Sequence, residues 1–130
     1  MNIILSIHPK WAKLIYEGKK TVEWRKNCPK KTGSKSTYYL YETAPVCKIT
    51  GYVTVNGDYA VDFKREHPVN EILEKEGCVS KEELVKYQGE SDYIYAWQIS
   101  SARRFRSPRT LDCFGLKRPP QSWCYTEVDV

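Results

Sequence analysis

The sequence predicts an α+β fold, a small and partly open β-barrel of about six strands with an early helix and a short helical pair inserted midway. Segments rich in β-branched and aromatic residues recur along most of the chain. Helical signals are confined to one stretch near the N-terminus and to the acidic middle. The length of 130 residues suffices for one hydrophobic core. We therefore expect a single domain over residues 1–130.

The first elements are a buried strand and an amphipathic helix. Residues 2–7 (NIILSI) form an apolar run typical of a buried strand. Pro9 suits the first position of a helix, Gly18 suits a left-handed helix end, and the apolar residues between them recur at helical spacing. A strand at 19–26 and a basic loop at 27–36 are expected to follow.

The middle of the chain is expected to hold two strands and then two helices. Residues 36–43 and 46–57 are strongly β in composition, and Gly51 is expected at a bulge or tight bend of the second strand. The spacing of apolar residues predicts a helix over 69–76. A capping box then opens a second helix within 80–89.

The C-terminal third returns to extended structure. Residues 91–101 predict a central strand with aromatic residues on both faces. Residues 103–114 predict a basic, extended edge that Pro108 interrupts. A last short strand is expected at 121–128.

Charge is unevenly distributed along the chain, whose net charge is +5. Residues 1–48 hold 10 Lys/Arg and 3 acidic residues, residues 49–92 hold 5 and 10, and residues 93–130 hold 6 and 3. If the two basic ends meet in the fold, they form a positive face of the kind that polyanion binders carry. From charge alone, an unevenly charged solvated surface is an equal alternative.

Several classes of protein are disfavoured by composition. No apolar run approaches the roughly 20 residues that span a bilayer, and no secretory signal is visible, so we expect a cytoplasmic protein without a membrane partner. The five cysteines are widely spaced without a CxxC pair, so we expect reduced, buried thiols and no metal site or cofactor. The oligomeric state is left open.

A charged motif stands directly after the first helix. It consists of Gly18, Lys20, Glu23 and Arg25, in the pattern GxKxxExR, within LSIHPKWAKLIYEGKKTVEWRK. Together with LYETAPVCKITGYVTV and RPPQSWCY, this segment resembles the ASCH family of bacterial and phage type, in the PUA-like superfamily. The resemblance implies a PUA-like β-barrel with a cleft beside the early helix, floored by the motif strand, that holds RNA or a nucleotide-like ligand. It also leaves a regulatory role open.

Strand geometry sets a condition on this cleft. Glu23 and Arg25 share a face of a regular strand, whereas Lys20 has the wrong parity and joins them only if the chain turns just after Gly18. Arg25 can then grip a phosphate, Lys20 can supply a charge, and Glu23 can accept from a base or act as general base. The alternative is an ion pair of Glu23 and Arg25 on a solvated barrel wall.

Other residues are weaker binding candidates. Ser6 and His8 flank the start of the first helix, and His8 can alternatively serve as a helix cap. Gln121 and Ser122 match the closing segment of the family and border the cleft or simply close the barrel. Trp11 is expected in the core, with base stacking as the alternative. Basic side chains elsewhere can contact phosphates, namely Lys30, Lys31, Lys35, Arg103, Arg104, Arg106 and Arg109.

An alternative hypothesis is that the same cleft is the active site of an enzyme. One branch of the proteins that this chain resembles consists of small amidohydrolases, which deacetylate N4-acetylcytidine with a lysine, a threonine and a glutamate. Lys20 matches the lysine, Glu23 stands at the threonine position, and Glu76 corresponds loosely to the glutamate. Lys20 and Glu23 are therefore the candidate catalytic residues, with Glu76 weaker, and a ribonuclease is also open. RNA or nucleotide binding is the first hypothesis and such a hydrolase is the alternative, so catalysis itself stays undecided at this stage.

Overall fold

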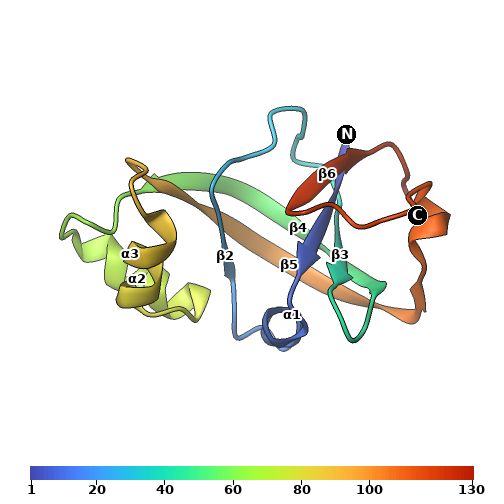
Figure 1. Ribbon diagram of the computed structural model, residues 1–130, viewed down its shortest axis with the longest axis horizontal. Coiled ribbons are helices and arrows are strands. Elements are labelled where there is room, and N and C mark those ends of the chain that lie inside the picture. The colour runs from blue at the N-terminus through green and yellow to red at the C-terminus, as the bar shows by residue number, and fades with distance from the viewer.

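A mixed sheet of six strands, curled into a half-barrel, forms the frame of the protein in a computed structural model that describes residues 1–130 (Figure 1). The strand order is β2-β5-β4-β3-β1-β6; β1 and β3 run parallel, and the other neighbours are antiparallel. The sheet and its three α-helices confirm the predicted fold. The elements are β1 (Asn2–Ile7), α1 (Pro9–Tyr16), β2 (Val22–Arg25), β3 (Tyr38–Glu42), β4 (Lys48–Val61), α2 (Pro68–Gly77), α3 (Lys81–Gln88), β5 (Ile94–Arg109), the short 3₁₀ helix η1 (Leu111–Phe114) and β6 (Trp123–Thr126).

Helix α1 ends in a turn that shortens the strand predicted after it. Gly18 adopts a left-handed conformation with φ of +77°, and the backbone N–H groups of Lys19 and Lys20 both donate to the Leu14 carbonyl, at 2.9 and 3.1 Å. These bonds hold residues 19–20 outside the sheet. The strand predicted over 19–26 therefore begins only at Val22.

The long strands β4 and β5 form a curved ribbon through the whole molecule. Gly51 lies beside an irregularity of this ribbon, and the carbonyl of Arg103 occupies the place that a side chain at residue 51 would take. This confirms the expected bend. The expected interruption at Pro108 is wrong, because β5 continues to Arg109. Pro108 lies where the pairing with β4 is irregular, so its missing N–H breaks no regular ladder.

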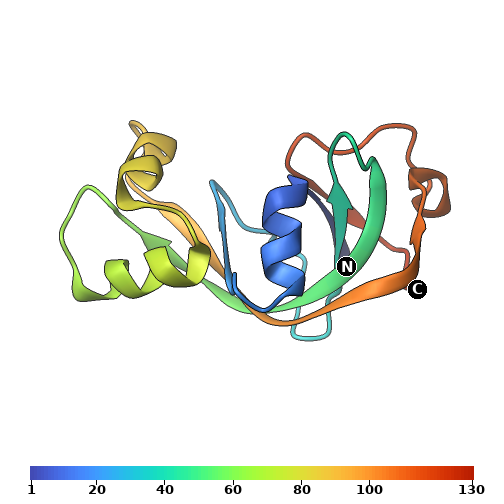
Figure 2. The ribbon, with the colours of Figure 1, turned by 90° about the horizontal axis from the view of Figure 1, so that it is seen from below.

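Two hydrophobic clusters place α1 and the helical pair at different parts of the sheet. Helix α1 lies inside the curl of the sheet, where Ala12 and Ile15 pack with Trp97 (Figure 2). Helices α2 and α3 cover the far end of the β4–β5 ribbon, where Leu73 and Leu84 pack with residues of β2, β4 and β5. Strand β2 therefore runs between two helical walls.

The prediction of buried cysteines is wrong. All five thiols are free, as expected, but Cys47 and Cys113 are exposed and the other three are half-buried. Three of them lie in loops or turns (Cys28, Cys47 and Cys78), Cys113 lies in the short helix η1, and Cys124 lies in the edge strand β6. None of the helices has the length and apolar composition that crossing a lipid bilayer requires.

Candidate functional site

The three charged residues of the motif meet at the edge of the sheet. The Lys20 ammonium lies 3.5 Å from Oε1 of Glu23, and Nη2 of Arg25 lies 2.6 Å from Oε2 of the same carboxylate. Glu23 thus stands between two cations. The turn after Gly18, which was the condition set by strand parity, brings Lys20 to the side of β2 that Glu23 and Arg25 share.

Strand β2 directs its residues by simple alternation. Val22 and Trp24 enter the hydrophobic cluster under the helical pair, and Glu23 and Arg25 point to the other face. Gly77 at the end of α2 makes room for this arrangement, because a side chain there would overlap the Trp24 indole. The motif strand is therefore anchored by apolar packing on one face and by charge on the other.

Lys20 is the most enclosed of the three charged residues, with 1% of its surface exposed. Its ammonium donates a hydrogen bond to the Gly77 carbonyl and lies 4.9 Å from the centre of the Trp11 ring. Burial lowers the pKa of Lys20 below its ordinary value of 10.5, and the Glu23 carboxylate opposes this shift. A lysine in such surroundings gives up its proton more readily than one in water.

Arg25 connects segments that are distant in the sequence through its hydrogen bonds. Its Nε and Nη2 atoms donate to Oε2 of Glu23 at 3.0 and 2.6 Å, its Nη1 donates to the Ser122 hydroxyl at 3.0 Å, and its Nη2 also donates to the Ser6 carbonyl at 2.9 Å. The Ser6 hydroxyl in turn donates to the Pro120 carbonyl at 2.6 Å. The fork that was expected to grip a phosphate is thus occupied by Glu23, and four of the five guanidinium hydrogens that can be donated are engaged.

A cavity of about 300 Å³ opens over this cluster. Helix α1 contributes Trp11, the motif contributes its three charged residues, and α3 contributes Glu83 and Tyr87. Burial raises the pKa of Tyr87, so its hydroxyl stays protonated as a hydrogen-bond donor. The remaining lining residues are Trp24, Val79 and Leu84.

The ASCH domain model matches residues 5–109. The chain belongs to the ASCH family. The resemblance seen in the GxKxxExR segment is therefore confirmed, and no match was found among curated proteins.

Crystal structures of an ASCH protein from Zymomonas mobilis share the fold of this ASCH chain. The structure described only as ASCH from that organism is 25% identical, covers 97% of this chain and 87% of its own, and has a TM-score of 0.81. Two mutant proteins of ZmASCH are 23% and 24% identical, cover 97% of this chain and 88% and 90% of their own, and also have TM-scores of 0.81.

The other residues proposed from the sequence of this ASCH domain fall into two groups. Ser6 and Ser122 reach the charged cluster through Arg25. His8 is exposed and caps α1, since its Nδ1 accepts from the Lys10 N–H at 3.1 Å, and Gln121 is exposed. Neither lines the cavity over Lys20. Their roles in binding stay predictions.

Glu76 is not brought to the cluster. Its side chain lines a different cavity, whereas its backbone carbonyl accepts from the Thr21 N–H at 2.8 Å. The carboxylate that the helical pair contributes to the Lys20 cavity belongs to Glu83 instead. None of the more distant basic side chains lines that cavity, and Arg104 is paired with Glu42 at 3.6 Å.

Sequence reasoning missed the wall that α3 provides. The sequence predicted that Glu83 takes part in a capping box, but only half of this box forms. The Ser80 hydroxyl accepts from the Glu83 N–H at 3.3 Å, whereas the Glu83 carboxylate faces the cavity. Tyr87 lies one turn further along α3. The i, i+4 spacing of these two residues was the available signal for a shared face.

Proposed function

We propose that the cavity over Lys20, Glu23 and Arg25 binds one nucleoside or nucleotide unit of RNA. Its volume of about 300 Å³ is at the lower end of small-molecule pockets, which suits one such unit. Trp11 and Tyr87 supply aromatic surface for a base. The observation that carries the proposal is the convergence of two cations on the buried Glu23 carboxylate at the mouth of an aromatic-lined cavity.

The contacts already made inside the chain support different roles for the three charged residues. Arg25 fixes the Glu23 carboxylate, so its role is positioning. Glu23 keeps acceptor capacity on Oε1 for a base amino group, because Arg25 binds only Oε2. Lys20 has three donors, of which the Gly77 carbonyl and Glu23 take two, and the third is available for a carbonyl or phosphate oxygen of the ligand.

One observation favours hydrolysis as a second candidate function. Lys20 is desolvated with a lowered pKa, and no continuous row of basic residues lines the cavity, as a pure phosphate-binding groove would require. For an N-acetylated cytidine, neutral Lys20 would take a proton from water, and the hydroxide would attack the amide carbonyl. Cleavage of the bond from the carbonyl carbon to the exocyclic nitrogen, with return of the proton to that nitrogen, yields cytidine and acetic acid, which ionises to acetate and releases its proton to water.

The test compares Lys20→Ala with Lys19→Ala, because the Lys19 side chain is 68% exposed and lies next in sequence. Each protein is titrated with cytidine, N4-acetylcytidine and a short RNA by calorimetry, and the products are separated by chromatography. We expect affinity to fall roughly tenfold or more in Lys20→Ala and to be retained in Lys19→Ala. Acetate release that disappears only in Lys20→Ala identifies the hydrolase. Equal affinities in both variants contradict the proposed site.

A further inference from the structure

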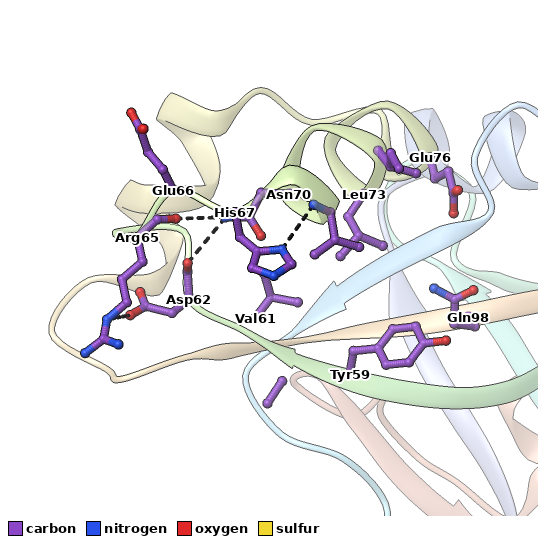
Figure 3. A pocket seen from close by; sticks show the side chains of 13 residues that line it. Tyr59, Val61, Asp62, Arg65, Glu66, His67, Asn70, Leu73, Glu76 and Gln98 are labelled. Atoms are coloured by element: carbon purple, nitrogen blue, oxygen red, sulfur yellow. Dashed lines mark hydrogen bonds and ion pairs between the residues drawn. The ribbon is translucent and has the colours of Figure 1, made fainter.

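A second cavity lies away from Lys20. It has a volume of about 750 Å³ and opens between α2 and the end of the β4–β5 ribbon (Figure 3). Its floor is apolar, formed by Val61 and Leu73, and its rim carries Val69 and Ile72, which are 41% and 55% exposed. A cavity of this size with an apolar floor and a few polar groups has the dimensions of a small-molecule site.

Three polar side chains without partners gather at one end of this cavity. Tyr59 and Gln98 are diagonal neighbours on the same face of the β4–β5 ribbon, because Tyr59 is paired with Ala96. The Glu76 carboxylate points from α2 toward them (Figure 3). None of the three side chains takes part in an ion pair or hydrogen bond within the chain. Their hydrogen-bonding capacity is therefore available to a ligand.

The chemistry of these groups selects a class of ligand. Tyr59 is 56% exposed, and its ring offers a face for stacking. A glutamine amide pairs with the adjacent amino group and ring nitrogen of adenine, and a carboxylate accepts from an amino group. At the other end of the cavity, His67 accepts from the Val69 N–H at 3.2 Å through Nδ1, which leaves the proton of the neutral ring on Nε2 as a donor.

Charge disfavours an anionic ligand. The lining holds three carboxylates, from Asp62, Glu66 and Glu76, and one guanidinium, from Arg65, which is paired with Asp62 at 3.6 Å. A phosphate would meet a net negative surface. We propose that this cavity is a second ligand site, which takes a neutral flat heterocycle with an amino group next to a ring nitrogen, the pattern of adenine.

The site has a direct link to the motif. The Glu76 carbonyl accepts from the Thr21 N–H, and the next carbonyl, that of Gly77, accepts from the Lys20 ammonium. A ligand held by the Glu76 side chain therefore contacts the same turn of α2 that holds Lys20 in place. The consequence for activity at Lys20 rests on the proposed function, whereas the site itself does not.

The test is a titration of the isotopically labelled protein with adenosine and with inosine, followed by amide NMR. Inosine is the matched ligand in which a carbonyl replaces the amino group. We expect adenosine to shift the amide signals of Ile72, Gln98 and Thr21, and inosine to bind roughly tenfold more weakly or worse. Tyr59→Ala and Glu76→Gln should each weaken adenosine binding roughly tenfold, while Glu71→Gln on the outer side of α2 should leave it unchanged.

The same spectra separate this inference from the proposed function. Shifts at Trp11 and Tyr87 report the cavity over Lys20, and shifts at Ile72 and Gln98 report the second cavity. Shifts confined to the first pair overturn the second site and leave the proposed function standing. The second site is also overturned if adenosine and inosine bind equally well, or if neither Tyr59→Ala nor Glu76→Gln weakens adenosine binding. The absence of any shift at Ile72 and Gln98 overturns it as well.

Discussion

Replacing Arg25 by alanine should destabilise the protein strongly, although the residue lies near its surface. The side chain is 13% exposed and makes four hydrogen bonds: two to Glu23 in the same strand, one to the end of β1 and one to the segment before β6. Removing one member of a buried ion pair costs about 3 to 5 kcal/mol. Lys20 remains beside Glu23 in the variant, so we expect the lower end, about 3 kcal/mol.

Urea denaturation followed by tryptophan fluorescence measures this loss, and thermal unfolding should show a midpoint lower by roughly 10 °C. Arg25→Lys keeps the charge but loses the fork, so its loss should be intermediate, about 1 to 2 kcal/mol. Arg106→Ala removes an exposed arginine of β5 and should stay within about 0.5 kcal/mol of the parent. A loss below about 1 kcal/mol for Arg25→Ala would refute the idea that Arg25 braces the site.

Three further changes test neighbouring parts of the account. The pKa of Lys20 is lower in the folded than in the unfolded protein, so the unfolded state binds more protons at pH values between the two. The free energy of unfolding of the parent, measured by denaturation at several pH values, should therefore rise with pH up to about 10.5 relative to that of Lys20→Met. A difference that stays constant with pH would count against a desolvated ammonium. Burial raises the pKa of Cys28 to about 12, so a thiol reagent at pH 8 should modify exposed Cys47 well before Cys28 by mass spectrometry, and equal rates would contradict this burial. Gly77→Ala should cost about 1 to 3 kcal/mol by calorimetry, because its methyl group meets the Trp24 indole; an unchanged stability would show that the indole moves freely.

Local rules in the sequence were sufficient for the framework of the site. Gly18 and the helical spacing before it indicate where α1 ends, and strand alternation places Glu23 and Arg25 on one face. By the same rules Lys20 can join them only if the chain turns directly after Gly18, and the structure contains that turn. These inferences succeed because each depends on residues only a few positions apart.

Contacts between distant segments were beyond those rules. Arg25 bonds to Ser122 across 97 positions, so the sequence could not show that its fork is occupied within the chain. The wall formed by Glu83 and Tyr87 depends on how α3 docks beside β2, which no local pattern records. Glu76 corresponded only loosely to the glutamate of the amidohydrolases, because it lies in a long acidic stretch, and the structure directs its side chain into the other cavity.

A crystal structure of the protein soaked with cytidine and cytidine monophosphate tests the central claim most directly. The account predicts that the ligand occupies the cavity lined by Trp11 and Tyr87, with a polar atom within hydrogen-bond distance of Lys20 or Glu23. A ligand held only by the exposed arginines of β5, with this cavity empty, would contradict it.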